Sequence, residues 1–179
     1  MSDISILKEM IKANIPLEVD NKVILREPAP ANYHITIEGM PNDDEVIIIK
    51  VDEFKSPDTI FYGTYGECKR ADFVIIAETS RKKVILCIEM KAGQGGTTTD
   101  ILHQLEGAKC FAAYCREIGQ TFWGNEKFLI NYEHRFVSIK NIKLSKTKPL
   151  VITDISSKAK LIMRSGKTFQ FNDLIQCKK

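Results

Sequence analysis

The sequence predicts an α/β protein with a mixed central sheet flanked by helices. The segments alternate along the chain as helix, antiparallel strands, helix and strand, which is typical of this class. Residues 70–78 and 84–91 are apolar on both faces, as expected of strands that are covered on both sides. We find no repeat and no linker, so we expect one domain over residues 1–179.

The first half of the chain contains one predicted helix and five predicted strands. Ile4, Leu7 and Ile11 fall on one stripe and predict a helix over residues 3–13. Alternating and apolar segments predict short strands over residues 22–26 and 33–38 and a strand over 46–49. The two strong strands, 70–78 and 84–91, are joined by a polar turn at residues 79–82 and predict a hairpin.

A long helix is predicted over residues 98–118, where Thr97 and Asp100 have the spacing of a capping box and Gly119 marks the end. Beyond it we expect strands near 134–140 and 149–153 and a hairpin across Ser165-Gly166. A short last helix is expected to be capped by Asn172.

Composition restricts the class of protein. The 44% hydrophobic and 27% charged residues are ordinary for a globular chain, and the apolar runs are too short to span a bilayer. The N-terminal residues lack the profile of a signal peptide, so we expect a cytoplasmic protein without a membrane partner. The five cysteines form no CxxC pair, which argues against a structural zinc site.

Positive charge is concentrated at the C-terminal end. Residues 134–179 hold 11 Lys and Arg but only two acids, whereas residues 1–133 hold 15 basic and 21 acidic residues. One-sided charge of this kind suits a polyanion, although a solvated lysine-rich face is the alternative. The expected nucleic-acid contacts are Lys140, Lys143, Lys146 and Lys148.

Asp72 and Glu89 are expected to face each other across the strong hairpin. A turn at Ser80-Arg81 pairs residues whose numbers sum to about 161, which places the two acids opposite each other with Cβ atoms about 5 Å apart. Because side chains alternate along a strand, Lys91 lies on the same face, diagonal to Asp72. The sequence therefore predicts two carboxylates and one ammonium group where the free ends of the hairpin meet.

This group is electrostatically unfavourable unless it binds a cation. Two ionised carboxylates about 5 Å apart repel by roughly 3 kcal/mol at an effective dielectric of about 20. The apolar strands around them also reduce their solvation, and Lys91 supplies one positive charge against two negative ones. Oxygen ligands at this spacing suit Mg²⁺ or Mn²⁺. A structural ion pair at the end of a strand is the alternative interpretation.

Two segments resemble the PD-(D/E)xK nuclease superfamily, which includes many restriction enzymes, Holliday-junction resolvases and RecB-like exonucleases: Arg70-Ala71-Asp72-Phe73-Val74-Ile75 and Ile88-Glu89-Met90-Lys91-Ala92-Gly93. The resemblance covers about residues 45–140 and implies the αβββαβ core of the restriction-endonuclease-like fold. It also implies that Asp72, Glu89 and the backbone carbonyl of Met90 ligate Mg²⁺. The lysine of this superfamily orients or deprotonates the attacking water, and the resemblance implies this role for Lys91.

Two positions have more than one interpretation. The literal Pro-Asp pair is Pro57-Asp58, so Asp58 is an alternative first ligand; we favour Asp72 because Pro57-Asp58 is typical of a turn. Gln104 falls within the apolar stripe of the long helix, where many members of the superfamily carry a glutamine. A catalytic role for Gln104 and a structural bond to a loop carbonyl are both open. RecB-like members carry tyrosine four residues later, where this chain has Ala108.

The expected function is that of a Mg²⁺-dependent endonuclease that hydrolyses DNA phosphodiester bonds, in the manner of a type II restriction enzyme, with Mn²⁺ able to substitute. A homodimer is expected, because such nucleases cut both strands. The alternatives are a repair, recombination or junction-resolving nuclease, a nuclease that acts on RNA, and a nucleic-acid-binding module that does not cleave. The residues expected to carry out catalysis are Asp72, Glu89, Lys91 and Gln104.

Overall fold

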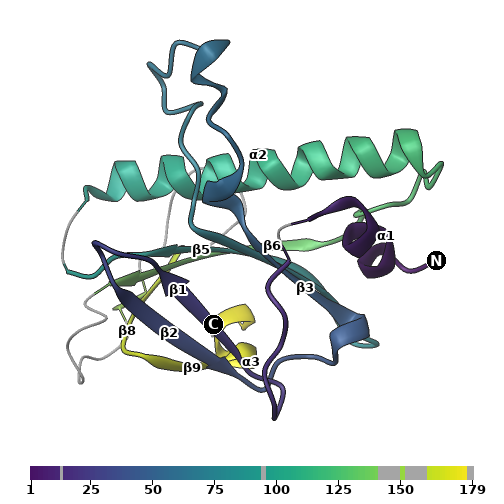
Figure 1. Ribbon diagram of the computed structural model, residues 1–179, viewed down its shortest axis with the longest axis horizontal. Helices are drawn as coiled ribbons and strands as arrows, with labels where there is room; N and C mark the ends of the chain where they lie inside the picture. The colour runs from purple at the N-terminus through teal and green to yellow at the C-terminus, as the bar shows by residue number, and fades with distance from the viewer. Residues whose placement is uncertain (13, 94–95, 141–149, 152–160, 177–179) are drawn as a thin grey trace.

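A six-stranded mixed sheet forms the centre of the computed structural model, which describes residues 1–12, 14–93, 96–140, 150–151 and 161–176 (Figure 1). Its strand order is β3-β4-β5-β6-β8-β7. β3 to β5 are successively antiparallel, β5, β6 and β8 are parallel, and β7 is antiparallel to β8. The strands are Val46–Lys50 (β3), Phe73–Glu78 (β4), Lys83–Met90 (β5), Glu133–Lys140 (β6), Leu150–Val151 (β7) and Leu161–Ser165 (β8). The expected α/β class with a mixed sheet is confirmed.

Two helices cover one face of this sheet. α1 (Asp3–Met10) packs on β3 and β4, and α2 (Thr98–Phe122) packs on β5 and β6. The buried positions of α2 recur every three or four residues, which is the period of one helix face. They are Ile101, Leu105, Ala108, Ala112, Cys115 and Gly119. In the described part of the chain, no helix has the length and apolar character needed to cross a membrane.

A second, three-stranded sheet covers the opposite face together with α3 (Phe171–Ile175) (Figure 1). β1 (Val23–Glu27) and β2 (Tyr33–Glu38) are antiparallel, and β9 (Thr168–Gln170) is parallel to β2. The expectation that helices flank the central sheet therefore holds for one face, while the other face is covered mainly by strands. This double cover explains why β4 and β5 are apolar on both sides.

Three local expectations were wrong. α2 continues past Gly119 to Phe122. Gly119 does not end the helix; its lack of a side chain leaves room for the Phe128 ring inside the core. No hairpin crosses Ser165-Gly166: β8 pairs with β6 and β7, whereas β9 pairs with β2 in the other sheet. The N-cap of α3 is Gln170, not Asn172, and makes no capping hydrogen bond through its side chain. Of the strand expected over 149–153, the structure describes Leu150–Val151, and the other positions lie outside the described residues.

Three short 3₁₀ turns complete the described elements: η1 (Asp43–Glu45), η2 (Val51–Glu53) and η3 (Pro57–Thr59). η2 and η3 belong to the long connection between β3 and β4. This connection leaves the sheet, passes α2 and returns to the start of β4 (Figure 1). It thereby delivers the chain to Asp72, the residue that immediately precedes β4.

Candidate functional site

The β4–β5 hairpin has the register that the sequence predicts. Phe73 pairs with Ile88 and Val74 pairs with Cys87, so continuation of the ladder places Asp72 opposite Glu89. Val74 and Cys87 belong to the hydrophobic cluster under α1 and α2. Because side chains alternate along a strand, Glu89 extends toward the helical face of the sheet. The structure therefore brings Asp72, Glu89 and Lys91 together at the end of the hairpin.

The position of Asp72 is held through both its backbone and its side chain. Its carbonyl accepts a hydrogen bond from the Val51 backbone N–H at 2.9 Å. Its Oδ2 accepts a hydrogen bond from the Met90 backbone N–H at 2.6 Å, so a side-chain oxygen serves as acceptor just beyond the last paired residues of β4 and β5. One carboxylate oxygen thus has a backbone partner, and the Asp72 side chain is held next to the end of β5.

Glu89 is the fully buried acid of the site, with none of its side-chain surface exposed. Lys91 Nζ lies 2.5 Å from Glu89 Oε1, and the Lys91 side chain is partly exposed. Among the described residues, only Lys91 and the Asp72 backbone stabilise the Glu89 carboxylate. A fully buried carboxylate whose charge is balanced by one partly exposed ammonium group is costly for the protein to keep ionised.

The two acids have raised pKa values. Burial is the largest cause for Asp72, and the neighbouring Glu89 carboxylate is the second; together they raise the pKa of Asp72 from 3.8 to about 8. Burial also raises the pKa of Glu89, although the Lys91 ammonium opposes the increase. Burial lowers the pKa of Lys91, but the hydrogen bond and charge of Glu89, with the charges of Asp72 and Glu27, together raise it above its ordinary value. The site therefore favours a bound cation, and Lys91 is protonated at neutral pH.

Two residues from the three-stranded sheet complete the site, and the sequence analysis did not identify them. Tyr33 in β2 donates its hydroxyl hydrogen to the Met90 carbonyl oxygen at 3.1 Å. Burial raises the pKa of Tyr33, and the charges of Asp72, Glu27 and Glu89 raise it further. Burial likewise raises the pKa of Glu27 in β1, whose Oε1 is buried without a hydrogen bond among the described residues.

A hollow of about 590 Å³ opens beside Glu27 and Tyr33. Lys50 of β3 also lines it, with its Nζ 2.5 Å from Asp52 Oδ2 and 3.9 Å from Glu27 Oε1. Phe73 contributes its ring, over which the Lys50 ammonium lies at 5.6 Å from the centroid. The site is thus bordered by polar and charged groups on the side of the three-stranded sheet.

Ser138 is a further buried polar residue beside the acids. It pairs with Glu89 in the parallel β5–β6 ladder, so the two side chains extend from the same face. Its Oγ is buried without a hydrogen-bond partner in the described part of the chain. The unusual signal in the sequence is a serine inside an otherwise apolar strand, Phe136-Val137-Ser138-Ile139.

The N-terminus of α2 lies near Lys91. Thr97 caps this helix by accepting the Asp100 backbone N–H at 3.1 Å, in agreement with the predicted capping box. A Cβ atom at Gly96 would lie 3.7 Å from Lys91 Cε. Gly107 of α2 approaches the Lys69 carbonyl so closely that an added Cβ would lie 1.8 Å from it. Only glycine permits this contact, which positions the chain that leads to Asp72.

The other residues expected to act at the site differ in burial and position, and some lie outside the described residues. Gln104 is half-buried on α2, and no hydrogen bond of its side chain is described, so its role stays a prediction. Asp58 lies in η3 and is exposed, in the connection between β3 and β4. Lys140 is half-buried at the end of β6. Lys143, Lys146 and Lys148 lie outside the described residues.

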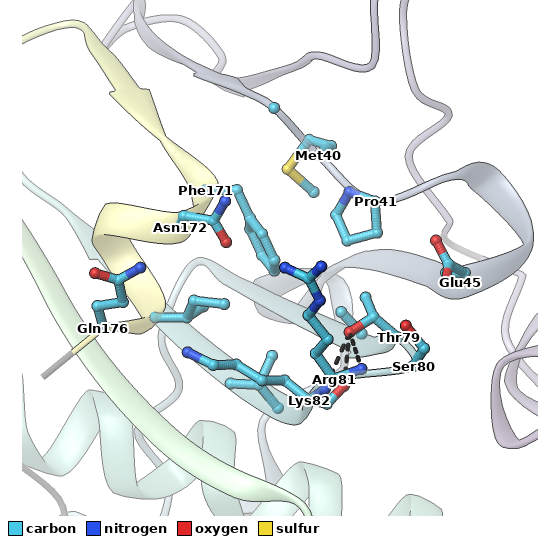
Figure 2. Close-up of a pocket in the computed structure, with 14 residues that line it drawn as sticks. Met40, Pro41, Glu45, Thr79, Ser80, Arg81, Lys82, Phe171, Asn172 and Gln176 are labelled. Atoms are coloured by element: carbon cyan, nitrogen blue, oxygen red, sulfur yellow. Dashed lines mark hydrogen bonds between the residues drawn. The ribbon is translucent and has the colours of Figure 1, made fainter.

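A different hollow, of about 460 Å³, lies at the other end of the hairpin, beside the turn at residues 79–82 (Figure 2). Figure 2 shows the Arg81 side chain extending toward Pro41 and Phe171, and Thr79 closing the turn through hydrogen bonds. None of the residues expected to act in catalysis lines this hollow. The candidate chemistry is therefore confined to the open end of the hairpin.

The oxygen atoms at that end suit a hard divalent cation. In the described residues, no three His, Cys, Asp or Glu side chains are grouped as metal ligands. The available donors are the carboxylates of Asp72 and Glu89 and the Met90 carbonyl, which keeps a second lone pair beside the Tyr33 hydrogen bond. Mg²⁺ is commonly held by one or two carboxylates while it retains several waters. The buried Glu89 carboxylate, which has a single ammonium group beside it, fits such a group.

Comparison with known proteins adds no further assignment. No protein-family model, curated protein or solved structure matches this chain.

Proposed function

We propose that this chain is a Mg²⁺-dependent nuclease that hydrolyses DNA phosphodiester bonds at Asp72, Glu89 and Lys91. The main supporting observation is the Glu89 carboxylate, which is fully buried beside Asp72 and lies 2.5 Å from the Lys91 ammonium. Buried acids whose pKa is perturbed by burial and a specific charged neighbour cluster at functional sites.

The arrangement of the elements supports the proposal. If β1 and β2 of the other sheet are left out, the remaining elements follow the order α1, β3, β4, β5, α2 and β6. This order is compatible with the αβββαβ core that the resemblance to the PD-(D/E)xK superfamily implies. β3, β4 and β5 form an antiparallel meander and β6 joins β5 in parallel. In this arrangement the acids lie at the edge where β4 begins and β5 ends, beside the N-terminus of α2.

Each residue has a role that follows from its contacts. Asp72, Glu89 and the Met90 carbonyl would hold Mg²⁺, which when bound lowers the pKa of water and neutralises charge on a phosphoryl oxygen. The Tyr33 hydroxyl, bonded to the Met90 carbonyl, maintains the direction of that oxygen. Lys91 has a raised pKa and therefore acts as a charged hydrogen-bond donor that orients water or a phosphoryl oxygen.

We further propose that the nuclease acts as an endonuclease in the manner of a type II restriction enzyme and as a homodimer, because a single site cuts one strand at a time. A role in repair, recombination or junction resolution would use the same chemistry on a different substrate. The substrate assay below separates these roles.

The test is incubation of the purified protein with plasmid, linear duplex, branched DNA and RNA, each with Mg²⁺ and with EDTA. We expect cleavage of DNA in Mg²⁺ alone, with Mn²⁺ able to replace it. Glu89→Gln and Lys91→Ala should each abolish cleavage while their circular dichroism spectra match that of the wild type. Asp58→Asn is the matched control and should cleave normally, because Asp58 is exposed in η3.

Two results would contradict the proposal. Cleavage that persists in EDTA or in Glu89→Gln would show that the activity arises elsewhere or from a contaminant. Binding to DNA without cleavage of any substrate in Mg²⁺ or Mn²⁺ would instead support a nucleic-acid-binding module.

A further inference from the structure

An arm rich in exposed aromatic residues projects from the molecule next to the proposed active site. We define the aromatic arm as residues 54–66, which lie between η2 and β4 and include η3. Figure 1 shows this segment extending beyond α2 on the side away from both sheets. Its large apolar residues are mostly open to solvent: Phe54, Ile60, Phe61, Tyr62 and Tyr65.

The arm is internally ordered by specific hydrogen bonds. The Glu67 carboxylate accepts the backbone N–H groups of Gly63 and Tyr65, at 2.9 and 2.8 Å. The backbone N–H groups of Ile60 and Phe61 both donate to the Pro57 carbonyl at 2.9 Å. These hydrogen bonds hold the loop in a defined shape, while the rings of Tyr62 and Tyr65 remain mostly exposed to solvent.

Contacts with α2 fix the base of the arm. The Phe54 ring packs against Phe111 and Tyr114, with ring centroids 5.4 and 6.2 Å away. Gly66 has a φ of +87°, and a Cβ there would lie 2.6 Å from the His103 ring. These contacts join the arm to the outer surface of α2.

A second set of contacts joins the arm to the proposed active site. Lys69, just after the arm, forms an ion pair with Asp100 in the first turn of α2. Asp100 bonds to the Thr97 cap, and Gly96 lies against Lys91. The chain reaches Asp72 three residues after Lys69. The arm and Asp72 are therefore parts of one continuous segment that leads into β4.

The high exposure of the two tyrosines of the arm is unusual for aromatic residues that serve only to stabilise the fold. Tyr62 is 101% exposed and Tyr65 is 85% exposed, so neither ring contributes to the core. Groups of exposed apolar residues on ordered segments commonly mark a binding surface. Tyrosine rings stack on nucleobases without regard to base identity, because every base has a π face.

We propose that the aromatic arm binds DNA substrate by stacking Tyr62 and Tyr65 on unpaired bases next to the cleaved phosphodiester. The proposal rests on the proposed nuclease function and narrows its substrate to DNA that contains single-stranded or unstacked nucleotides. Among the proposed roles it favours repair, recombination or junction resolution over restriction of an intact duplex. The base of the arm is tied through Lys69 and Asp100 to the α2 N-terminus, which lies beside Lys91. This link to the proposed active site favours a nucleic acid over a protein partner. The arm carries one Lys and one Asp, Lys55 and Asp58, and therefore has no net charge, so we expect ring stacking rather than charge to supply its affinity.

The test compares binding of a blunt duplex and of the same duplex with a single-stranded tail, by fluorescence anisotropy in Ca²⁺. The wild type should bind the tailed duplex more tightly. Tyr62→Ala with Tyr65→Ala should weaken the tailed complex about tenfold or more and leave the blunt complex nearly unchanged. Tyr62→Phe with Tyr65→Phe keeps both rings and should restore the preference for the tail.

Phe122→Ala is the matched control, because Phe122 is 77% exposed but lies at the far end of α2. It should bind both duplexes like the wild type. Because the assay measures binding, the arm can be tested even if no cleavage is found. The proposal would be overturned if the double alanine variant lost affinity equally for both duplexes, or lost no affinity for either. Loss of self-association in that variant, measured by light scattering, with unchanged DNA binding would assign the arm to a second copy of the chain and also overturn it.

Discussion

Replacing Asp72 by asparagine should stabilise the metal-free protein while it removes a proposed ligand. The asparagine Oδ1 can still accept the Met90 N–H that Asp72 Oδ2 accepts at 2.6 Å, so the hydrogen bond is retained. The substitution therefore removes one negative charge from the group with little change in shape. Its effect on the free energy of unfolding reports the cost of burying the Asp72 charge together with its repulsion by Glu89.

The magnitude follows from the cross-strand geometry. Carboxylates about 5 Å apart repel by roughly 3 kcal/mol at an effective dielectric of about 20. The substitution also removes the attraction of Lys91 for Asp72, which affects the pKa of Asp72 less than Glu89 does. We therefore expect a net gain of about 1–2 kcal/mol, or about 2–8 °C in melting temperature for a chain of this length.

The stability gained by Asp72→Asn should increase as the pH rises. The pKa of Asp72 is raised from 3.8 to about 8, so between these values the unfolded chain is ionised and the folded chain keeps its proton. The stability of the wild type should fall as pH rises through this window, and this fall should be weaker in the asparagine variant. The gain in the free energy of unfolding from Asp72→Asn is therefore expected to be small near pH 4 and to reach its full value above about pH 8.

Melting temperatures measured in EDTA across this range test the reasoning. Asp58→Asn is the matched control, since the same chemical change at an exposed site should alter stability by less than about 0.5 kcal/mol. A destabilised Asp72→Asn at pH 9, or a gain that is the same at pH 4 and pH 9, would refute the proposed repulsion.

Three further predictions concern the surroundings of the acids. Tyr33→Phe removes the hydroxyl that bonds to the Met90 carbonyl and should lower kcat with a stability loss of about 1 kcal/mol; an unchanged kcat would exclude a positioning role. Gln104→Ala should lower cleavage without unfolding α2, and a large drop in melting temperature with unchanged specific activity would show that Gln104 is structural. Neutralising the C-terminal lysines should flatten the dependence of log affinity on log salt by about one unit for each lost phosphate contact, and an unchanged slope would mean a solvated face. The lysines to replace by glutamine are Lys140, Lys143, Lys146 and Lys148.

The hairpin was predictable because its signals are local. A polar turn between two apolar segments determines the register, and the observed pairing of Phe73 with Ile88 agrees with it. Alternation then places Glu89 and Lys91 on one face, so the grouping of the candidate acids required no long-range information. The Thr97 cap was predictable for the same reason, since its partner Asp100 is three residues away.

Pairing between distant segments was not predictable in this way. Ser165-Gly166 has the composition of a turn, but composition does not determine whether the two flanking strands pair with each other or with different sheets. Gly119 has the appearance of a helix end, yet its lack of a side chain serves the close packing of Phe128. Tyr33 is 57 positions from Met90, and no spacing rule connects them.

The backbone of Met90 shows why both sheets are needed to define the site. Its N–H donates to Asp72 at the start of β4, and its carbonyl accepts from Tyr33 in β2. Its side chain is buried in the hydrophobic cluster between the two sheets, while Glu89 extends toward the helices. A slip of β5 by one residue would move Glu89 into that cluster and Met90 to the polar side, and it would break both hydrogen bonds. The three-stranded sheet therefore helps to hold Glu89 and Lys91 in register, so substitutions at the interface between the sheets should affect catalysis as well as stability.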